Sequence, residues 1–184
     1  IFFGITLLAI SIFISLSTLS FNYYETGWQS LSNIEIRNIF GQYGSYVSGF
    51  LLKEFGILTP ISLSIILILY GFKHLKYQVI SNLWFKLIMI IGLVIISGLL
   101  SQPIHEILNM FFLLENEMLN YEGFSAKLYN SILLIVNEKL NLEGNYSFIF
   151  VNLLITLLFI FSFIYIASTK ISELIFLKKT VKPF

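Results

Sequence analysis

The chain has 184 residues, of which 57% are hydrophobic and only 11% are charged. A soluble domain normally carries about 25% charged residues, so this composition leaves too little polar surface to cover a water-soluble globule and indicates a polytopic membrane protein. The formal net charge of +1 gives no overall attraction for nucleic acid, and the absence of cysteine excludes disulfides and thiolate metal sites.

The chain begins at Ile1 inside an apolar segment, and we expect it to be a fragment with a preceding part. The segment lacks the basic start and the Ala-x-Ala site of a signal peptide, so it predicts a first membrane span. Ser11, Ser15 and Thr18 recur at helical spacing within it. These hydroxyls suit close contact with another helix, and bonding back to carbonyl groups of their own helix is an equal alternative.

Four apolar segments are long enough to cross hydrocarbon as helices. They cover about residues 1–21, 49–72, 83–101 and 148–167. Pro60 is expected to kink the second span mildly, which membrane helices tolerate. Gln102-Pro103 is expected to end the third span, because the residue before a proline is displaced from helical geometry.

Polar side chains near the spans are few. Lys53 and Glu54 lie in the first turns of the second predicted span, where snorkelling to the outer interface is favoured over an intramembrane functional pair. Asn152 and Thr156 share one face of the fourth span. Buried in a bundle, they would form hydrogen bonds across helices for about 1 kcal/mol.

The charges of the connecting segments orient the spans. The loop that begins at Lys73 and the tail 170–184 are basic, whereas the connections 22–48 and 105–146 are net acidic. Positive charge beside a span resists translocation. Both termini are therefore predicted in the cytoplasm, with the two acidic connections on the outer side.

Residues 125–140, within the longer outer connection, predict an amphipathic helix. Its polar stripe is interrupted only by Leu134, and the opposite face is apolar, with Leu128, Ile132, Leu133, Ile135, Val136 and Leu140. The apolar core of this helix is too short to cross a membrane. We expect the helix to lie along the outer membrane surface or to pack on the outer ends of the spans.

The sequence offers no constellation for chemistry. His74 and His105 are assigned to opposite sides of the membrane, and His105-Glu106 lacks the second histidine of an H-E-x-x-H zinc motif. No P-loop is present, and no charged residue falls at mid-membrane depth. We therefore predict no catalytic, cofactor-binding or metal-binding residues and no enzymatic activity in this chain.

Short motifs made mostly of glycine and aromatic residues divide the chain. They are S-F-N-Y-Y-E-T-G-W at 20–28, N-I-F-G-Q-Y-G-S-Y-V-S-G-F-L-L-K-E-F-G at 38–56, G-F-K-H-L at 71–75, Gly123-Phe124 and L-E-G at 142–144. The first three resemble the S-Y-N-x-x-D-P-S-W turn, the N-x-x-G-x-x-G-A-x-x-A-D-x-L-x-x-x-F-G segment and the G-W-R-x-L exit of FtsK/SpoIIIE-type DNA translocases. The last two are similar to the closing segment of that family's N-terminal membrane domain.

The resemblance implies that residues 1–169 are the four-span membrane domain of a large cell-division protein. A basic cytoplasmic tail, 170–184, would lead to a linker and a hexameric RecA-like motor that uses ATP and magnesium to pump DNA through the closing septum. By this resemblance the domain is a non-catalytic anchor in the bacterial inner membrane. Its partners would be the lipid bilayer and other division proteins, contacted through the outer loops and spans, without direct contact to nucleic acid.

Two other classes of function are alternatives to a membrane anchor. A subunit of a small transporter or channel would need ionisable residues that line a path at mid-membrane depth. An intramembrane enzyme would need clustered His, Asp, Glu or Ser at one depth. Neither pattern is visible in the sequence.

Overall fold

The computed structural model describes residues 2–22, 26–28, 35–77, 83–112, 123–140 and 144–167. Within these residues the regular structure is helical throughout and no strand is present. The helices are α1 (Phe2–Leu19), α2 (Gly41–Phe55), α3 (Leu58–Tyr77), α4 (Leu83–Phe112), α5 (Phe124–Leu140) and α6 (Gly144–Ala167). The predicted all-α class is confirmed.

Four of these helices are long and apolar enough to cross a membrane. The candidate spans are Phe2–Leu19, Leu58–Lys76, Phe85–Glu106 and Asn145–Ala167. Many of their large apolar side chains are exposed on the outside of the bundle, as contact with lipid requires. The predicted polytopic membrane architecture with four spans is therefore confirmed.

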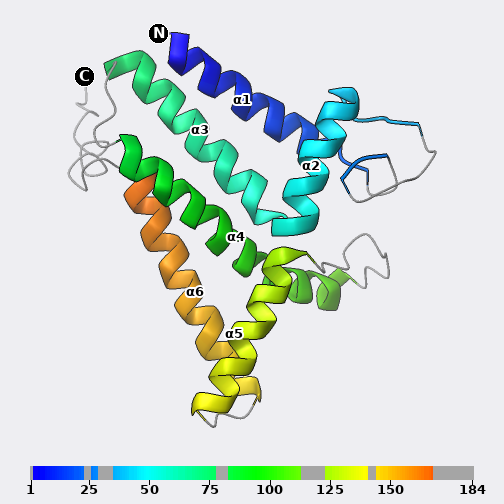
Figure 1. Ribbon diagram of the computed structural model, residues 1–184, viewed down its shortest axis with the longest axis vertical. Coiled ribbons are helices and arrows are strands. Elements are labelled where there is room, and N and C mark those ends of the chain that lie inside the picture. The colour runs from blue at the N-terminus through cyan, green and yellow to red at the C-terminus, as the bar shows by residue number, and fades with distance from the viewer. Residues whose placement is uncertain are drawn as a thin grey trace, which may run out of the picture.

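The spans alternate in direction, so four helix ends meet at one end of the bundle (Figure 1). The beginning of α1 meets the end of α3, where the ring centroids of Phe3 and His74 are 5.1 Å apart. The beginning of α4 meets the end of α6, where those of Phe85 and Tyr165 are 5.9 Å apart. The beginning of the first span and the end of the last span therefore lie at the same end of the bundle.

The two remaining helices lie at the other end. Figure 1 shows α2 crossing the ends of α1 and α3, and α5 filling the space where α4 and α6 diverge. The last residue of α2 and the first of α5 are adjacent, since the rings of Phe55 and Phe124 are 6.1 Å apart. The two helices thus follow one another across this end of the bundle.

The predicted start of the second span, near residue 49, is wrong. The helix that contains Gly49 is α2, which ends at Phe55, and the span begins at Leu58 in α3. Gly56 separates the two with φ 78°, a conformation that side chains with a Cβ rarely adopt. Its N–H donates to the Leu52 carbonyl at 3.0 Å, which closes α2 with a glycine cap.

Both predictions about proline are corrected. Pro60 is the third residue of α3, where a helix needs no N–H donor, so it supports the start of the span instead of kinking it. Pro103 does not end the third span, because α4 continues to Phe112 with Pro103 buried inside it. Membrane helices tolerate such a proline where neighbouring groups surround the freed backbone.

The predicted amphipathic helix is confirmed as α5. Leu128, Ile132, Leu133 and Val136 pack against a buried cluster that α4, α5 and α6 build together from Leu99, Tyr129, Val151 and Ile155. The helix therefore packs on the spans, which is one of the two placements that the sequence left open. Leu134, which interrupts the polar stripe, is exposed, and so is Ile135 at its edge.

The contact between α1 and α3 depends on small residues. A Cβ on Gly4 would lie 2.9 Å from the Gly71 carbonyl oxygen, so the two backbones touch. Further along, the Ser11 hydroxyl donates to the Ser64 carbonyl of α3 at 2.9 Å. Thr18 instead donates to Ile14 of its own helix at 2.7 Å, so both alternatives for these hydroxyls occur.

We expect Gly4→Ala to destabilise the chain by about 1–3 kcal/mol, because backbone cannot yield to an added methyl group as a flexible side chain can. Gly92→Ala is the matched control, since a Cβ there meets nothing within 4 Å. Thermal unfolding in detergent micelles measures both. Equal midpoints for the two variants would contradict the close α1–α3 contact.

Candidate membrane-anchoring site

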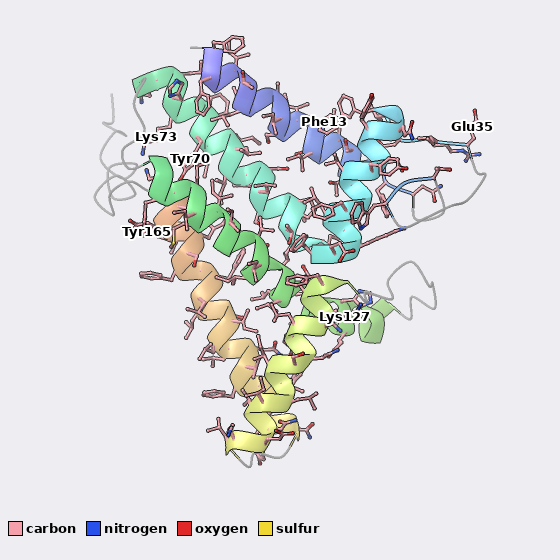
Figure 2. All side chains as sticks on the ribbon, viewed as in Figure 1. Phe13, Glu35, Tyr70, Lys73, Lys127 and Tyr165 are labelled. Atoms are coloured by element: carbon pink, nitrogen blue, oxygen red, sulfur yellow. The ribbon has the colours of Figure 1, made fainter. Side chains whose placement is uncertain are left out.

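The basic end of the bundle is defined by Lys73, Lys76 and Lys86. Lys86 lies in the first turn of the α4 span and is only 4% exposed, and its Nζ lies 5.7 Å from the centroid of the Tyr70 ring. Figure 2 shows Lys73, Tyr70 and Tyr165 at this end, opposite Glu35 and Lys127. Of the acidic residues that the structure describes, Glu35 lies opposite this end (Figure 2), and Glu54, Glu106 and Glu138 belong to α2, the second half of α4 and α5.

The core beneath the basic end joins three spans. Ile66 and Tyr70 of α3, Leu93 of α4 and Ile166 of α6 form one buried cluster. The Tyr70 hydroxyl donates to the Ile166 carbonyl at 2.9 Å, in the last described turn of α6. This bond fixes the end of the last span to α3.

At the opposite end, the α2–α5 junction is built on the carboxylate of Glu54. Its Oε1 accepts a hydrogen bond from Trp28 Nε1 at 3.0 Å, and its Oε2 accepts one from the Phe124 backbone N–H at 3.0 Å. Phe124 begins α5, where the backbone N–H groups have no helical acceptor and the helix dipole favours a negative charge. One side chain therefore joins the segment after α1, the end of α2 and the start of α5.

Two further polar contacts reinforce the α2–α5 junction. The Ser125 hydroxyl donates to the Glu54 carbonyl at 2.7 Å. Lys53 Nζ donates to the Trp28 carbonyl at 3.0 Å, and burial of the ammonium lowers the pKa of Lys53 below its usual value. Lys53 and Glu54 therefore both form hydrogen bonds with Trp28. These contacts within the protein differ from the snorkelling predicted for the two side chains.

Two glycines allow the helices of the α2–α5 junction to approach. A Cβ on Gly123 would overlap the Lys53 carbonyl oxygen and lie 2.7 Å from the Glu54 Cα. A Cβ on Gly98 of α4 would lie 2.5 Å from Ser125 Oγ. Gly123 therefore has a steric function that follows from the fold, and it is part of a motif that the sequence singled out.

A small hydroxyl cluster closes the gap between α3 and α4. Thr59 and Ser97 share a hydrogen bond of 2.9 Å between their hydroxyls, and both side chains are fully buried. The Leu58 N–H at the start of α3 donates to Ser101 Oγ at 3.2 Å. The α3 span thus begins with its first donor satisfied by a neighbouring helix.

Asn152 forms the predicted cross-helix bond in α6. It accepts from the Tyr129 hydroxyl of α5 at 3.0 Å, and burial raises the pKa of Tyr129 to about 12. Thr156 does not cross helices, since its hydroxyl donates to the Asn152 carbonyl of its own helix at 2.7 Å. Of these two polar residues, only Asn152 therefore links α6 to α5.

The two histidines lie at different ends of the bundle, His74 beside Phe3 and His105 in the second half of α4. The described part of the chain holds no group of three His, Asp or Glu side chains that could bind a metal. The basic tail, 170–184, lies outside the described residues. The contacts between the helices position them relative to one another, as a membrane domain requires.

Sequence reasoning missed the α2–α5 junction. Its members are separated by 26 and 70 positions along the chain, so no local pattern joins them. A signal was present in three places that the sequence singled out separately: the Trp28 motif, the adjacent Lys53 and Glu54, and Gly123-Phe124.

The fold defines a polytopic membrane domain with four spans. The first span begins and the last span ends at the basic end of the bundle. The family model described as the 4TM region of DNA translocase FtsK/SpoIIIE matches residues 1–169. The chain therefore belongs to this family, and the resemblance of its motifs is confirmed. No curated protein and no solved structure gave a significant match.

We expect Glu54→Gln to weaken the α2–α5 junction, because an amide offers one acceptor oxygen and turns its NH2 group toward Trp28 or the Phe124 N–H. The expected loss is about 1 kcal/mol or more, since hydrogen bonds to charged groups contribute more than neutral ones. Hydrogen–deuterium exchange of the first turn of α5 should accelerate, and the thermal midpoint should fall. Glu138→Gln, at an exposed position of α5, is the control, and identical behaviour of the two variants would contradict the assigned function of Glu54.

Proposed function

We propose that this chain is the membrane anchor of a DNA translocase and that it holds an ATP-driven motor at the division septum during chromosome segregation. The observation that carries the proposal is the family match over residues 1–169. The anchor contributes no catalysis, cofactor site or metal site of its own. ATP and magnesium belong to the motor, and so does the contact with DNA.

The position of the basic end supports a cytoplasmic attachment. Lys73 and Lys76 lie near the end of α3 and Lys86 near the beginning of α4, and both of these helix ends lie beside the beginning of α1 and the described end of α6 (Figure 1). Positive charge beside spans is retained in the cytoplasm. A chain that continues beyond α6 would then enter the compartment that holds the DNA. We accordingly assign the protein to the bacterial inner membrane with both termini inside.

The opposite end of the bundle is the surface available to other division proteins. α2, α5 and the exposed residues Glu35 and Arg37 lie there, on the outer side in the proposed orientation. Assembly into a hexamer follows from the motor, whose subunits would bring six anchors together. Large apolar side chains are exposed on the outside of the described spans, where neighbouring anchors would contact them.

A transporter or channel subunit is the alternative, and the positions of charge disfavour it. The ionisable side chains of the described spans lie near their ends, with Lys73, Lys76 and Lys86 at one end and His105 and Glu106 at the other. An ion or proton pathway would need such a group near the middle of the bilayer.

Cysteine labelling tests the orientation, since the chain has no native cysteine. A cysteine at Ser131, on the exposed face of α5, should react with a membrane-impermeant maleimide in intact cells. A cysteine at Gln78, between α3 and α4 in the sequence, should react only after the membrane is permeabilised. The reverse pattern would place the basic end outside and overturn the anchor.

A further inference from the structure

We propose that α2 is an interfacial helix whose Tyr43, Tyr46 and Phe50 lie in the outer headgroup layer of the same bilayer that the four spans cross. The partner is a lipid surface, and the contact is made by a helix that does not itself cross the membrane. The inference rests on the proposed anchor and adds a second mode of membrane contact to it.

The two faces of α2 differ sharply. One face is made of small residues and is buried, with Gly44, Ser45, Ser48 and Gly49. Ser45 donates to the Thr26 carbonyl at 2.9 Å, and a Cβ on Gly49 would lie 3.2 Å from the Trp28 Cβ. This face is fully occupied by the protein itself.

The other face of α2 is aromatic and open as far as Phe50, beyond which Lys53 and Glu54 continue it and are both bound to Trp28. Tyr43 is 81% exposed, Tyr46 41% and Phe50 38%, and Ile39 just before the helix is 62% exposed. The spacing of three and four residues places these side chains on one side of the helix. The side chains from Ile39 to Phe50 on this face carry no charge, whereas α5 presents Lys127, Asn130 and Ser131 at exposed positions. A continuous exposed apolar stripe of this kind marks a contact surface.

The place of α2 in the fold indicates lipid as the occupant. The helix crosses the ends of α1 and α3, so it lies at the depth where those spans leave the hydrocarbon (Figure 1). Beyond Gly56, Ile57 and, within α3, Ile61 and Ile65 are exposed, so the span that follows α2 also carries open apolar side chains. Tyrosine suits the headgroup layer because its ring is apolar and its hydroxyl remains hydrated.

A chain of ring contacts extends this aromatic surface to α5. Trp28 and Phe50 are 5.0 Å apart, Phe50 and Phe55 5.5 Å, and Phe55 and Phe124 6.1 Å, measured between ring centroids. The series follows the α2–α5 junction. Aromatic rings are enriched at this level of membrane proteins, where they set the depth of the spans. We infer that α2 fixes how far the outer end of the bundle rises from the bilayer.

Nitroxide spin labels test the proposal in the full 184-residue chain, reconstituted in vesicles of phosphatidylethanolamine and phosphatidylglycerol. Single cysteines at Tyr43, Tyr46 and Phe50 are labelled, and relaxation by oxygen is compared with relaxation by a water-soluble nickel chelate. The lipid reference is Ile65→Cys on α3, and the water reference is Ser131→Cys on α5. The proposal expects a ratio of oxygen to nickel accessibility at the three positions several-fold above that of Ser131.

Each other result overturns the inference. Nickel accessibility equal to that of Ser131 would show that the α2 face is in water. Low accessibility to both reagents would show that a second copy of the chain or another protein segment covers it. If Ile65 is itself not accessible to oxygen, the anchor proposal fails as well, so the two failures are distinguishable. Three positions are used so that the loss of one variant to misfolding still leaves a decision.

Discussion

A backbone N–H or C=O group without a partner costs several kcal/mol inside hydrocarbon, and this constraint decides where the chain can turn. The four spans satisfy it within themselves. At the α2–α3 turn, Gly56 has a positive φ. Two residues later, the Leu58 N–H donates to Ser101 Oγ. The irregular backbone therefore falls at the end of the spans, where neighbouring helices supply acceptors.

The same constraint explains the α2–α5 junction. A helix that begins against other helices exposes N–H donors that need acceptors, and Glu54 provides one for Phe124 while also accepting from Trp28. Glycine at 123 allows the backbone of α2 to come close enough for that bond. α2 and α5 are thus joined to each other as well as to the spans, and they form one layer that closes the end of the bundle opposite Lys73, Lys76 and Lys86.

The sequence predicts what depends on composition and local periodicity. The four spans and the amphipathic helix were accessible because long apolar segments and a 3.6-residue pattern are local signals. The separate helix α2 was not, because the break between α2 and α3 depends on the positive φ of Gly56, which the residue type permits but does not require. Pro103 was misread for a related reason: its cost to a helix depends on neighbours that the sequence does not place. The Glu54 contacts join parts of the chain far apart in sequence, so they required the fold.

Four candidate spans return the chain to the end of the bundle where it began, and in the proposed orientation that end, with Lys73, Lys76 and Lys86, faces the cytoplasm. This is the geometry that a membrane anchor needs if a motor working on DNA follows it. The most direct measurement is to determine the coding sequence downstream of Phe184. The account predicts a continuous reading frame that encodes, after a linker, the P-loop G-x-x-x-x-G-K-[ST] of an ATPase. A stop codon soon after Phe184, or a following domain without a nucleotide-binding loop, would contradict it.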